Sequence, residues 1–286
     1  MISLMDEFQH HPDHHSPLWW ENYHFNGYDL EHSMGISLYT AIKPVLKSKE
    51  DIIIIHSHPQ LILQRQYSLR AHDIFSTGAL KMEPLVLMKQ WNIHIANTFA
   101  CYKEGISTGI TQEVSADLFF ETESEPYGFT TRRGTRYEQV GILQGEIYLN
   151  DEVIQFNGKG MRDHSWELRN ISSWGEWYWL MGRLTSDDTV SFICSKHNDQ
   201  SVSDGWMDRH GIQKIQHVEL TSTFSSGKLE RCHAHLITDS ESFDILIRPI
   251  STVTVTLGKE QKRIQGRESL VTINNGEGYG FLWYGS

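Results

Sequence analysis

The side chains most able to do chemistry gather in one stretch, Gly158-Lys-Gly-Met-Arg-Asp-His-Ser-Trp-Glu-Leu-Arg169. Asp163, His164 and the arginines can hold charge or move a proton, and Trp166 offers a flat face with one N–H donor. Burying such groups is costly unless they pair with one another or act on a ligand. The stretch is therefore either an ion-pair network that holds sheets together or part of a reaction site.

Strand geometry would sort this cluster onto two faces. Alternate side chains of an extended strand point to the same side, so Arg162, His164 and Trp166 would share one face. We expect His164 and Trp166 to point into a cavity together. A β-bulge at Gly160 would reverse this assignment, because one extra residue shifts the alternation.

The opposite face would carry the acidic residues of the stretch. We expect Asp163 to pair with Arg169 or Arg183, and such a pair lowers the pKa of a carboxyl group. That suits a structural brace more than an acid, while Glu167 is a second candidate acid on this face. The candidate catalytic residues are Asp163, His164, Trp166 and Glu167. The candidate substrate-binding residues are Trp174, Trp177, Trp179, Arg162, Arg169 and Arg183.

The sequence around this stretch predicts an all-β protein with little helix. Apolar residues alternate with polar ones in segments such as 93–96 and 252–257, which is the period of a half-buried strand. Two further strands are expected about a turn at Asn150-Asp151. So many short strands exceed one small barrel, which predicts two packed antiparallel β-barrels or sandwiches. We place the domains at residues 1–157 and 158–286, with the reactive stretch at their junction.

The composition of the 286 residues excludes several classes of function. The net charge is -11 and no dense run of Lys or Arg occurs, which argues against a nucleic-acid or anionic membrane surface. No apolar run reaches the roughly 20 residues of a membrane helix, and the N-terminus lacks the pattern of a signal peptide. Three cysteines without a CxxC spacing argue against a disulfide framework and fit a reducing compartment. We expect a cytoplasmic protein, and its oligomeric state stays open.

Sixteen histidines raise the question of metal binding. One group lies in a polar segment interrupted by proline, where nothing would fix a ligand geometry: His10, His11, His14 and His15. Two pairs occupy alternate positions of expected strands: His56 with His58, and His233 with His235. No carboxylate motif accompanies either pair, so half-exposed strand histidines account for them. We predict no metal and no other cofactor.

Several motifs from residue 137 onward resemble those of one superfamily. Tyr137-Glu-Gln, Gly145-Glu-Ile and the Gly158-x-Gly-x-Arg-Asp-His-Ser-Trp block are similar to the central signature of the AttH-like and carotenoid 1,2-hydratase-like proteins. Trp177 with Gly182-Arg183, and the later Gly278-Tyr-Gly, also resemble that pattern. The resemblance spans most of the chain from residue 16 onward, and the Asp-His-Ser-Trp block is its most specific part.

This resemblance implies two lipocalin-like β-barrels, with the Asp-His-x-Trp block near a cavity between them. It also implies an apolar cavity, free of cofactors, that folds a polyene, with His164 and Trp166 taking part in catalysis. The sequence departs from the hydratase pattern in two places. An additional aspartate has no match in the segment 189–194, and Glu167 stands where glycine usually follows the block. Glu167 would therefore bring a new carboxylate to the cavity.

Hydration or cyclisation of an alkene begins with delivery of a proton to carbon. A carboxylic acid in an apolar pocket stays protonated near neutral pH, and aromatic faces stabilise the resulting cation by about 0.5–2 kcal/mol each. Asp163 or Glu167 would supply the acid. Four tryptophans are the candidate walls: Trp166, Trp174, Trp177 and Trp179.

These ingredients predict a lyase- or isomerase-type enzyme that hydrates or cyclises a hydrophobic isoprenoid or polyene by acid initiation. Two alternatives remain open. One is a Diels–Alderase-like pericyclase, in which the cavity folds the substrate and no acid is needed. The other is a non-catalytic lipocalin-like carrier of a hydrophobic ligand.

Overall fold

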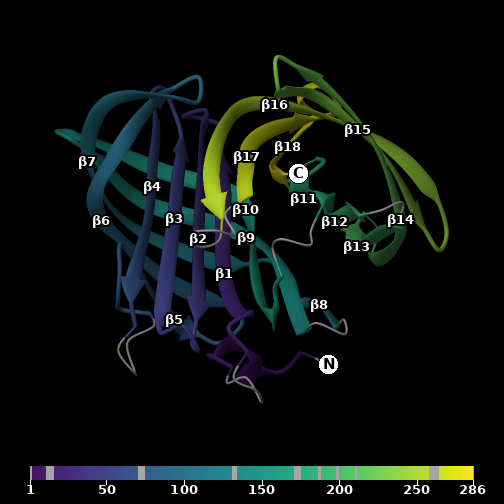
Figure 1. Cartoon of the computed structure of the whole chain (residues 1–286), viewed down its shortest axis with the longest axis horizontal. Coiled ribbons are helices and arrows are strands. Elements are labelled where there is room, and N and C mark those ends of the chain that lie inside the picture. The colour runs from purple at the N-terminus through teal and green to yellow at the C-terminus, as the bar shows by residue number, and fades with distance from the viewer. Residues whose placement is uncertain are drawn as a thin grey trace. The chain divides into compact units, whose positions relative to one another are not determined.

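The computed structural model describes residues 2–10, 16–69, 75–130, 134–170, 175–185, 188–197, 200–209, 211–257 and 264–285. The described chain is almost entirely antiparallel β-sheet, so the predicted all-β class is confirmed. It divides into two compact units, residues 1–169 and residues 170–286 (Figure 1). Each unit is a separate closed arrangement of strands.

The described residues of the first unit form one 3-10 helix and ten strands. They are η1 (Leu4–Glu7), β1 (Trp19–Asp29), β2 (Met34–Lys43), β3 (Ser48–His56), β4 (Gln60–Ser68), β5 (Leu80–Val86), β6 (Gln90–Lys103), β7 (Ile106–Thr122), β8 (Tyr127–Thr130), β9 (Gly134–Leu149) and β10 (Glu152–Leu168). The sheet order is β10-β1-β2-β3-β4-β6-β7-β9, and β9 pairs in turn with β10. The path therefore returns to its start and encloses one core, with β5 added beside β6 and β8 beside β9.

Large apolar side chains fill the interior of the first unit. The core includes Ile53 and Ile55 from the isoleucine-rich strand β3, and Trp91 and Phe120 from β6 and β7. These β-branched and aromatic residues suit a pleated, buried surface. Tyr23 and Phe25 of β1 belong to the same core, which identifies the face of β1 that points inward.

The second unit is a closed barrel in which each strand pairs with the next. Its elements are β11 (Glu176–Arg183), β12 (Thr189–His197), β13 (Gln200–Asp208), β14 (Ile212–Ser225), β15 (Lys228–Thr238), β16 (Ser242–Leu257), β17 (Ile264–Ile273), η4 (Asn274–Gly276) and β18 (Gly278–Gly285). Strand β18 pairs with β11 and completes the barrel. Tyr178 and Leu180 of β11 point into its core.

Strands β9 and β10 form the hairpin expected about Asn150-Asp151, but β10 is longer than the sequence suggested. The two glycines of the reactive stretch do not end the strand. A Cβ atom on Gly160 would lie 1.9 Å from the carbonyl oxygen of Asn26, so glycine there lets β10 pass close to β1. Because β10 continues to Leu168, the division between the units falls after Arg169 and not after residue 157.

The sequence also raised the questions of membrane helices and of disulfide bonds. Among the described residues, no helix is long and apolar enough to cross a membrane. The three cysteines, Cys101, Cys194 and Cys232, are buried and form no disulfide bond with one another.

Candidate functional site

Strand β10 lies between β1 and β9 and presents two polar faces. His164 is opposite Tyr23 of β1 and Tyr137 of β9. The register to both neighbours runs through Gly160 without a shift, so no bulge changes the alternation there. Arg162, His164 and Trp166 therefore share the face on which Tyr23 points into the core. The two residues expected to face a cavity together lie on the core side of the first barrel.

On this inner face, His164 sits between a carboxylate and a phenol. Its Nε2 lies 2.9 Å from Oε1 of Glu21, and its Nδ1 lies 3.3 Å from the hydroxyl of Tyr137. The ring of Tyr23 stacks on the imidazole, with 3.9 Å between the ring centroids. The side chains of His164 and Glu21 are fully buried. A rigid, water-poor imidazole–carboxylate pair results.

Glu21 comes from β1 and lies directly opposite Trp166. The sequence did not single it out, although it carried a signal. Glu21, Tyr23 and Phe25 occupy alternate positions, so an acidic residue continues the inward-facing period of two core aromatics. A charged residue in an apolar strand face is costly unless it is paired, which marks it as a partner for another polar group.

The N-terminal segment, residues 2–10, packs over the same inner face. His10 stacks on Trp166 with 3.7 Å between ring centroids and an interplanar angle of 7°. Its Nδ1 lies 3.1 Å from Glu21, and its Nε2 lies 3.3 Å from Asp6. The side chain of His10 is 20% exposed, whereas His164 is fully buried. A chain of hydrogen-bonding groups therefore leads from the surface to His164.

The pKa values of His10, Glu21 and His164 are shifted in different directions. Burial alone would raise the pKa of Glu21, but its hydrogen bonds with His10 and His164 outweigh that effect and lower it. For His10, burial opposes the charged form, but the bonds to Glu21 and Asp6 raise its pKa overall. Burial lowers the pKa of His164 in spite of its bond to Glu21. Hydrogen bonding thus favours the charged forms of Glu21 and His10, whereas burial favours the neutral form of His164.

His10, Glu21 and His164 are also close enough together to bind one metal ion. One ligand atom from each of His10, Glu21 and His164 lies within 4.8 Å of the other two. The separations of 3.1 and 2.9 Å are shorter than the ~3.3 Å between two ligand atoms on a tetrahedral zinc ion with ~2.0 Å bonds. They match hydrogen bonds, so we interpret the group as a path for protons.

The outer face of β10 carries Asp163, whose partner differs from both residues suggested by the sequence. Arg136 of β9 donates to Oδ2 of Asp163 through Nε at 3.1 Å and Nη2 at 2.9 Å. The expected Arg169 instead donates to Ser165 at 2.8 Å, and Ser165 donates to Asp163 at 3.3 Å. Register decides this, because Arg136 lies opposite Ser165 and so shares the face of Asp163.

The pKa of Asp163 also departs from the sequence expectation. Burial raises it to about 6, in spite of the charge of Arg136. The ion pair was expected to lower the pKa, but complete burial of the carboxyl outweighs the attraction. Glu167, on the same face, is 24% exposed and pairs with Arg169 at 2.9 Å.

The remaining predicted residues belong to the second unit. Trp177, Trp179 and Arg183 alternate along β11 with residues that point into the barrel core, so they share its outer face. Both tryptophans are buried and Arg183 is half-buried. Trp174 lies outside the described residues.

The predicted pair His233 and His235 lies on β15, whereas His58 follows the end of β3 and shares no strand face with His56. His233 and His235 lie 3.5 and 2.9 Å from the carboxylate of Asp244, all three being exposed or half-exposed. His56 is buried at the end of β3. His11, His14 and His15 lie outside the described residues.

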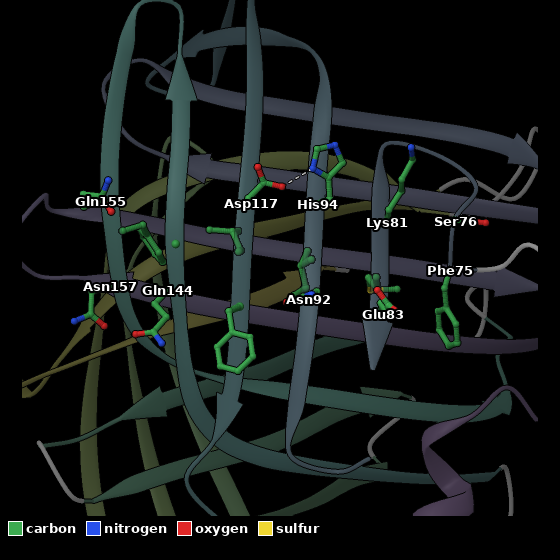
Figure 2. Close-up of a pocket in the computed structure, with 16 residues that line it drawn as sticks. Phe75, Ser76, Lys81, Glu83, Asn92, His94, Asp117, Gln144, Gln155 and Asn157 are labelled. Carbon is green, nitrogen blue, oxygen red and sulfur yellow. Dashed lines mark hydrogen bonds and ion pairs between the residues drawn. The ribbon is translucent and has the colours of Figure 1, made fainter. Parts of the chain in front are cut away.

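A separate open pocket of about 1080 Å³ lies on the first unit (Figure 2). Its lining includes His94 and Asp117, which Figure 2 shows pointing toward each other from neighbouring strands at 2.7 Å. Both side chains are exposed, at 46% and 71%. None of the residues predicted for the site lines this pocket. The exposed pair is thus a useful contrast to the buried pair of His164 and Glu21.

His24 on the outer face of β1 gives a prediction about stability in acid. It lies opposite Asp163 and Tyr39 and bonds through Nε2 to Ser37 at 2.9 Å. Burial, helped by the charge of Arg136, lowers its pKa to about 3. The folded protein therefore keeps His24 neutral, while the unfolded chain takes up a proton as the pH falls below about 6.5.

We expect this difference to cost about 2 kcal/mol of unfolding free energy between pH 7 and pH 5. Urea unfolding of the parent and of His24→Gln at both pH values measures it. The loss on going to pH 5 should be smaller in the variant by about that amount. Asp163 titrates in the opposite sense in both proteins, so the comparison isolates His24. Equal losses in the two proteins would mean that His24 is already charged in the folded state.

Comparison with solved structures reveals the same fold in proteins of very different sequence. A putative AttH from Nitrosomonas europaea aligns with a TM-score of 0.59 at 13% identity, over 93% of this chain and 91% of that one. CghA solved with Sch210972 aligns with a TM-score of 0.60 at 8% identity, over 94% and 89%. Kievitone hydratase from Nectria haematococca aligns with a TM-score of 0.55 at 9% identity, over 93% and 88%. The likeness to an AttH-type fold expected from the sequence motifs is therefore confirmed.

No curated protein sequence matches the chain. One family model does, and it covers nearly the whole sequence, from residue 3 to residue 285. The chain therefore belongs to the family described as a domain of unknown function, DUF7064.

Proposed function

We propose that the protein is a hydratase- or cyclase-type enzyme that protonates a carbon–carbon double bond of a hydrophobic isoprenoid or polyene. His164 would be the proton donor and Glu21 the carboxylate that orients and reloads it. The observation that carries this proposal is the 2.9 Å contact between these two fully buried side chains beside Trp166. A buried imidazole–carboxylate pair of this kind is a common acid–base device.

Burial favours the neutral form of His164, so the imidazole must first take up a proton before it can act as the acid. Burial lowers the pKa of His164, so its protonated ring gives up the proton more readily than a solvent-exposed histidine does. His10 is partly exposed and bonds to the same carboxylate, which offers a route for a proton from solvent through Glu21 to His164. Glu21 would also supply the carboxylate that the segment 189–194 lacks.

Aromatic rings surround the imidazole that would donate the proton. The rings of Tyr23, Tyr137 and Trp166 lie 3.9, 5.4 and 5.0 Å from the imidazole of His164, measured between centroids. Each ring face stabilises a nearby cation by about 0.5–2 kcal/mol. Rings this close to the donor would stabilise a tertiary carbocation formed beside it without forming a bond to it.

The structural neighbours support the class of enzyme and leave the substrate open. One neighbour is named a hydratase, and another was solved with Sch210972. The identities of 8–9% relate the folds alone, so the choice of residues rests on the geometry of this chain.

Turnover in D2O tests the proposal. The parent protein is incubated with acyclic isoprenoids (farnesol, geranylgeraniol and squalene) and with the polyene lycopene, and mass spectrometry measures carbon-bound deuterium in the product. We expect a deuterated hydration or cyclisation product, and a loss of about 10²–10⁴-fold in kcat for His164→Gln and for Glu21→Gln. His94→Gln is the matched control, because it removes an exposed imidazole bonded to a carboxylate at 2.7 Å and should leave kcat unchanged.

Several outcomes would overturn the proposal. Normal turnover in both buried variants would exclude the pair as the proton source. A cyclised product without deuterium would favour catalysis by shape alone. Tight binding of every compound without turnover would favour a carrier, and turnover that required added Zn²⁺ would assign the three residues to a metal.

A further inference from the structure

Arg162 is a fully buried cation whose hydrogen bonds are incomplete. Its side chain is 1% exposed, and its guanidinium carbon lies 5.4 Å from the ring of Trp91 and 5.0 Å from that of Tyr137. Its Nη2 donates to Glu7 at 2.5 Å and to the hydroxyl of Tyr137. Within the described part of the chain, its Nε and Nη1 have no hydrogen-bond partner, and neither has Nε1 of Trp91.

Such unpaired donors are unusual and costly. Arg carries five N–H donors in a rigid fork, and a buried donor without an acceptor costs about 1–3 kcal/mol, more when it is charged. Aromatic faces offset part of this cost but accept no strong hydrogen bond. The guanidinium therefore retains capacity to bind another acceptor, above all a carboxylate, whose two oxygens match the fork.

The acceptor present is Glu7 from the chain's own N-terminal segment. Its carboxylate receives hydrogen bonds from Arg162, from the Tyr137 hydroxyl at 2.9 Å and from the backbone N–H of Met88. These three donors define the carboxylate niche. The segment that delivers Glu7 is one turn of 3-10 helix in which Leu4 and Met5 are 59% and 70% exposed. A short turn at the N-terminus therefore delivers a carboxylate to a site built for one.

A cavity adjoins the niche. About 620 Å³ of space is lined by Ile2, Ser3 and Leu4 of the segment, by Met88 and by Gln139. Met88 is itself one of the three donors to Glu7. Gln139 lies opposite Arg162 on β9, and its Oε1 is buried without a partner among the described residues. The cavity therefore reaches the edge of the niche.

We infer that the niche of Arg162, Tyr137 and the Met88 N–H binds the carboxylate of the substrate, and that Glu7 is an internal substitute which the substrate displaces. The ligand is an apolar chain with an acid group at one end. Tyr137 links the niche to His164 at 3.3 Å, so a carboxylate held there brings the adjoining carbons to the imidazole. The inference rests on the proposed function in calling this ligand the substrate, whereas the carboxylate site stands on its own geometry.

Binding of two probes that differ in their end group tests the niche. Retinoic acid and retinol share one polyene chain, and quenching of tryptophan fluorescence measures the Kd of each. We expect Glu7→Ala to bind retinoic acid about tenfold or more tightly than the parent does, because the competing carboxylate is gone. The Kd of retinol should stay within about twofold, since retinol makes no charge-assisted bond. Glu152→Ala is the control, because it removes an exposed carboxylate at the start of β10, away from the niche, and should leave both Kd values unchanged.

The preference for the acid should depend on the niche. In the Glu7→Ala background, Arg162→Gln should abolish the difference between the two probes. If that variant fails to fold, Tyr137→Phe takes its place and should reduce the difference. Equal affinities of Glu7→Ala for acid and alcohol would overturn the inference, and so would a preference that survives both replacements. These measurements need no turnover, so they fail or succeed independently of the proton donor assigned to His164.

Discussion

Replacing Asp163 with alanine is expected to lower the free energy of unfolding by about 3–5 kcal/mol. The reason is the cation left behind. Arg136 is buried, and its closest carboxylates are those of Asp163 at 2.9 Å and Glu138 at 3.4 Å. Because burial raises the pKa of Asp163 to about 6, the charged pair is no strong source of stability in itself. The loss comes from leaving the guanidinium without its main acceptor.

Urea unfolding at pH 7 measures this loss, and a second variant identifies its cause. Asp163→Leu combined with Arg136→Met removes both charges and should recover most of the stability, because a buried pair can be exchanged for apolar residues at little cost. If the double variant were as unstable as Asp163→Ala, the damage would lie in packing and not in an unpaired charge. A single variant as stable as the parent would show that Glu138 alone satisfies Arg136.

Replacing Gly160 with alanine is expected to destabilise the first unit by about 3 kcal/mol or more. The added Cβ would meet the backbone of Asn26 at 1.9 Å, and a backbone atom cannot move aside without separating β10 from β1. The melting temperature and the urea midpoint both report the effect. Turnover should fall with it, since β10 carries the proposed proton donor.

Gly266→Ala is the matched control for this prediction. Gly266 also lies inside a strand, but the nearest atom to its added Cβ is the flexible end of Leu257 at 3.2 Å. We expect a change within about 1 kcal/mol, since alanine also restricts the unfolded chain. Similar losses at the two positions would contradict the role given to the close strand approach at Gly160.

The alternation of side chains was predictable from the sequence, whereas the partners across strands were not. A period of two placed Arg162, His164 and Trp166 on one face, and that face exists because β10 stays extended through Leu168. Which residues oppose them depends on register with β1 and β9, and no local pattern specifies register between strands far apart in the chain. Asp163 was accordingly matched with the wrong arginine.

The N-terminal segment is the part of the candidate site that sequence reasoning could least supply. Glu7 and His10 stand in a short polar stretch without strand or helix periodicity, so nothing local predicts that they would be buried or half-buried against β10. The two glycines misled in another way. They were interpreted as the start of a new domain, but a close approach of two strands needs small residues as much as a turn does.

The bond between Glu7 and Arg162 spans 155 residues and has a consequence for biosynthesis. At about 5–20 residues per second, Glu7 leaves the ribosome some 8–30 s before its partner is made. During that interval the niche does not exist, and the strand that completes it is the last of the first unit. Closure of the first barrel and capture of the N-terminal segment should therefore occur together, after residue 168 has emerged. Pairing of Glu7 with Arg162 therefore requires that the last strand of the first unit is in place.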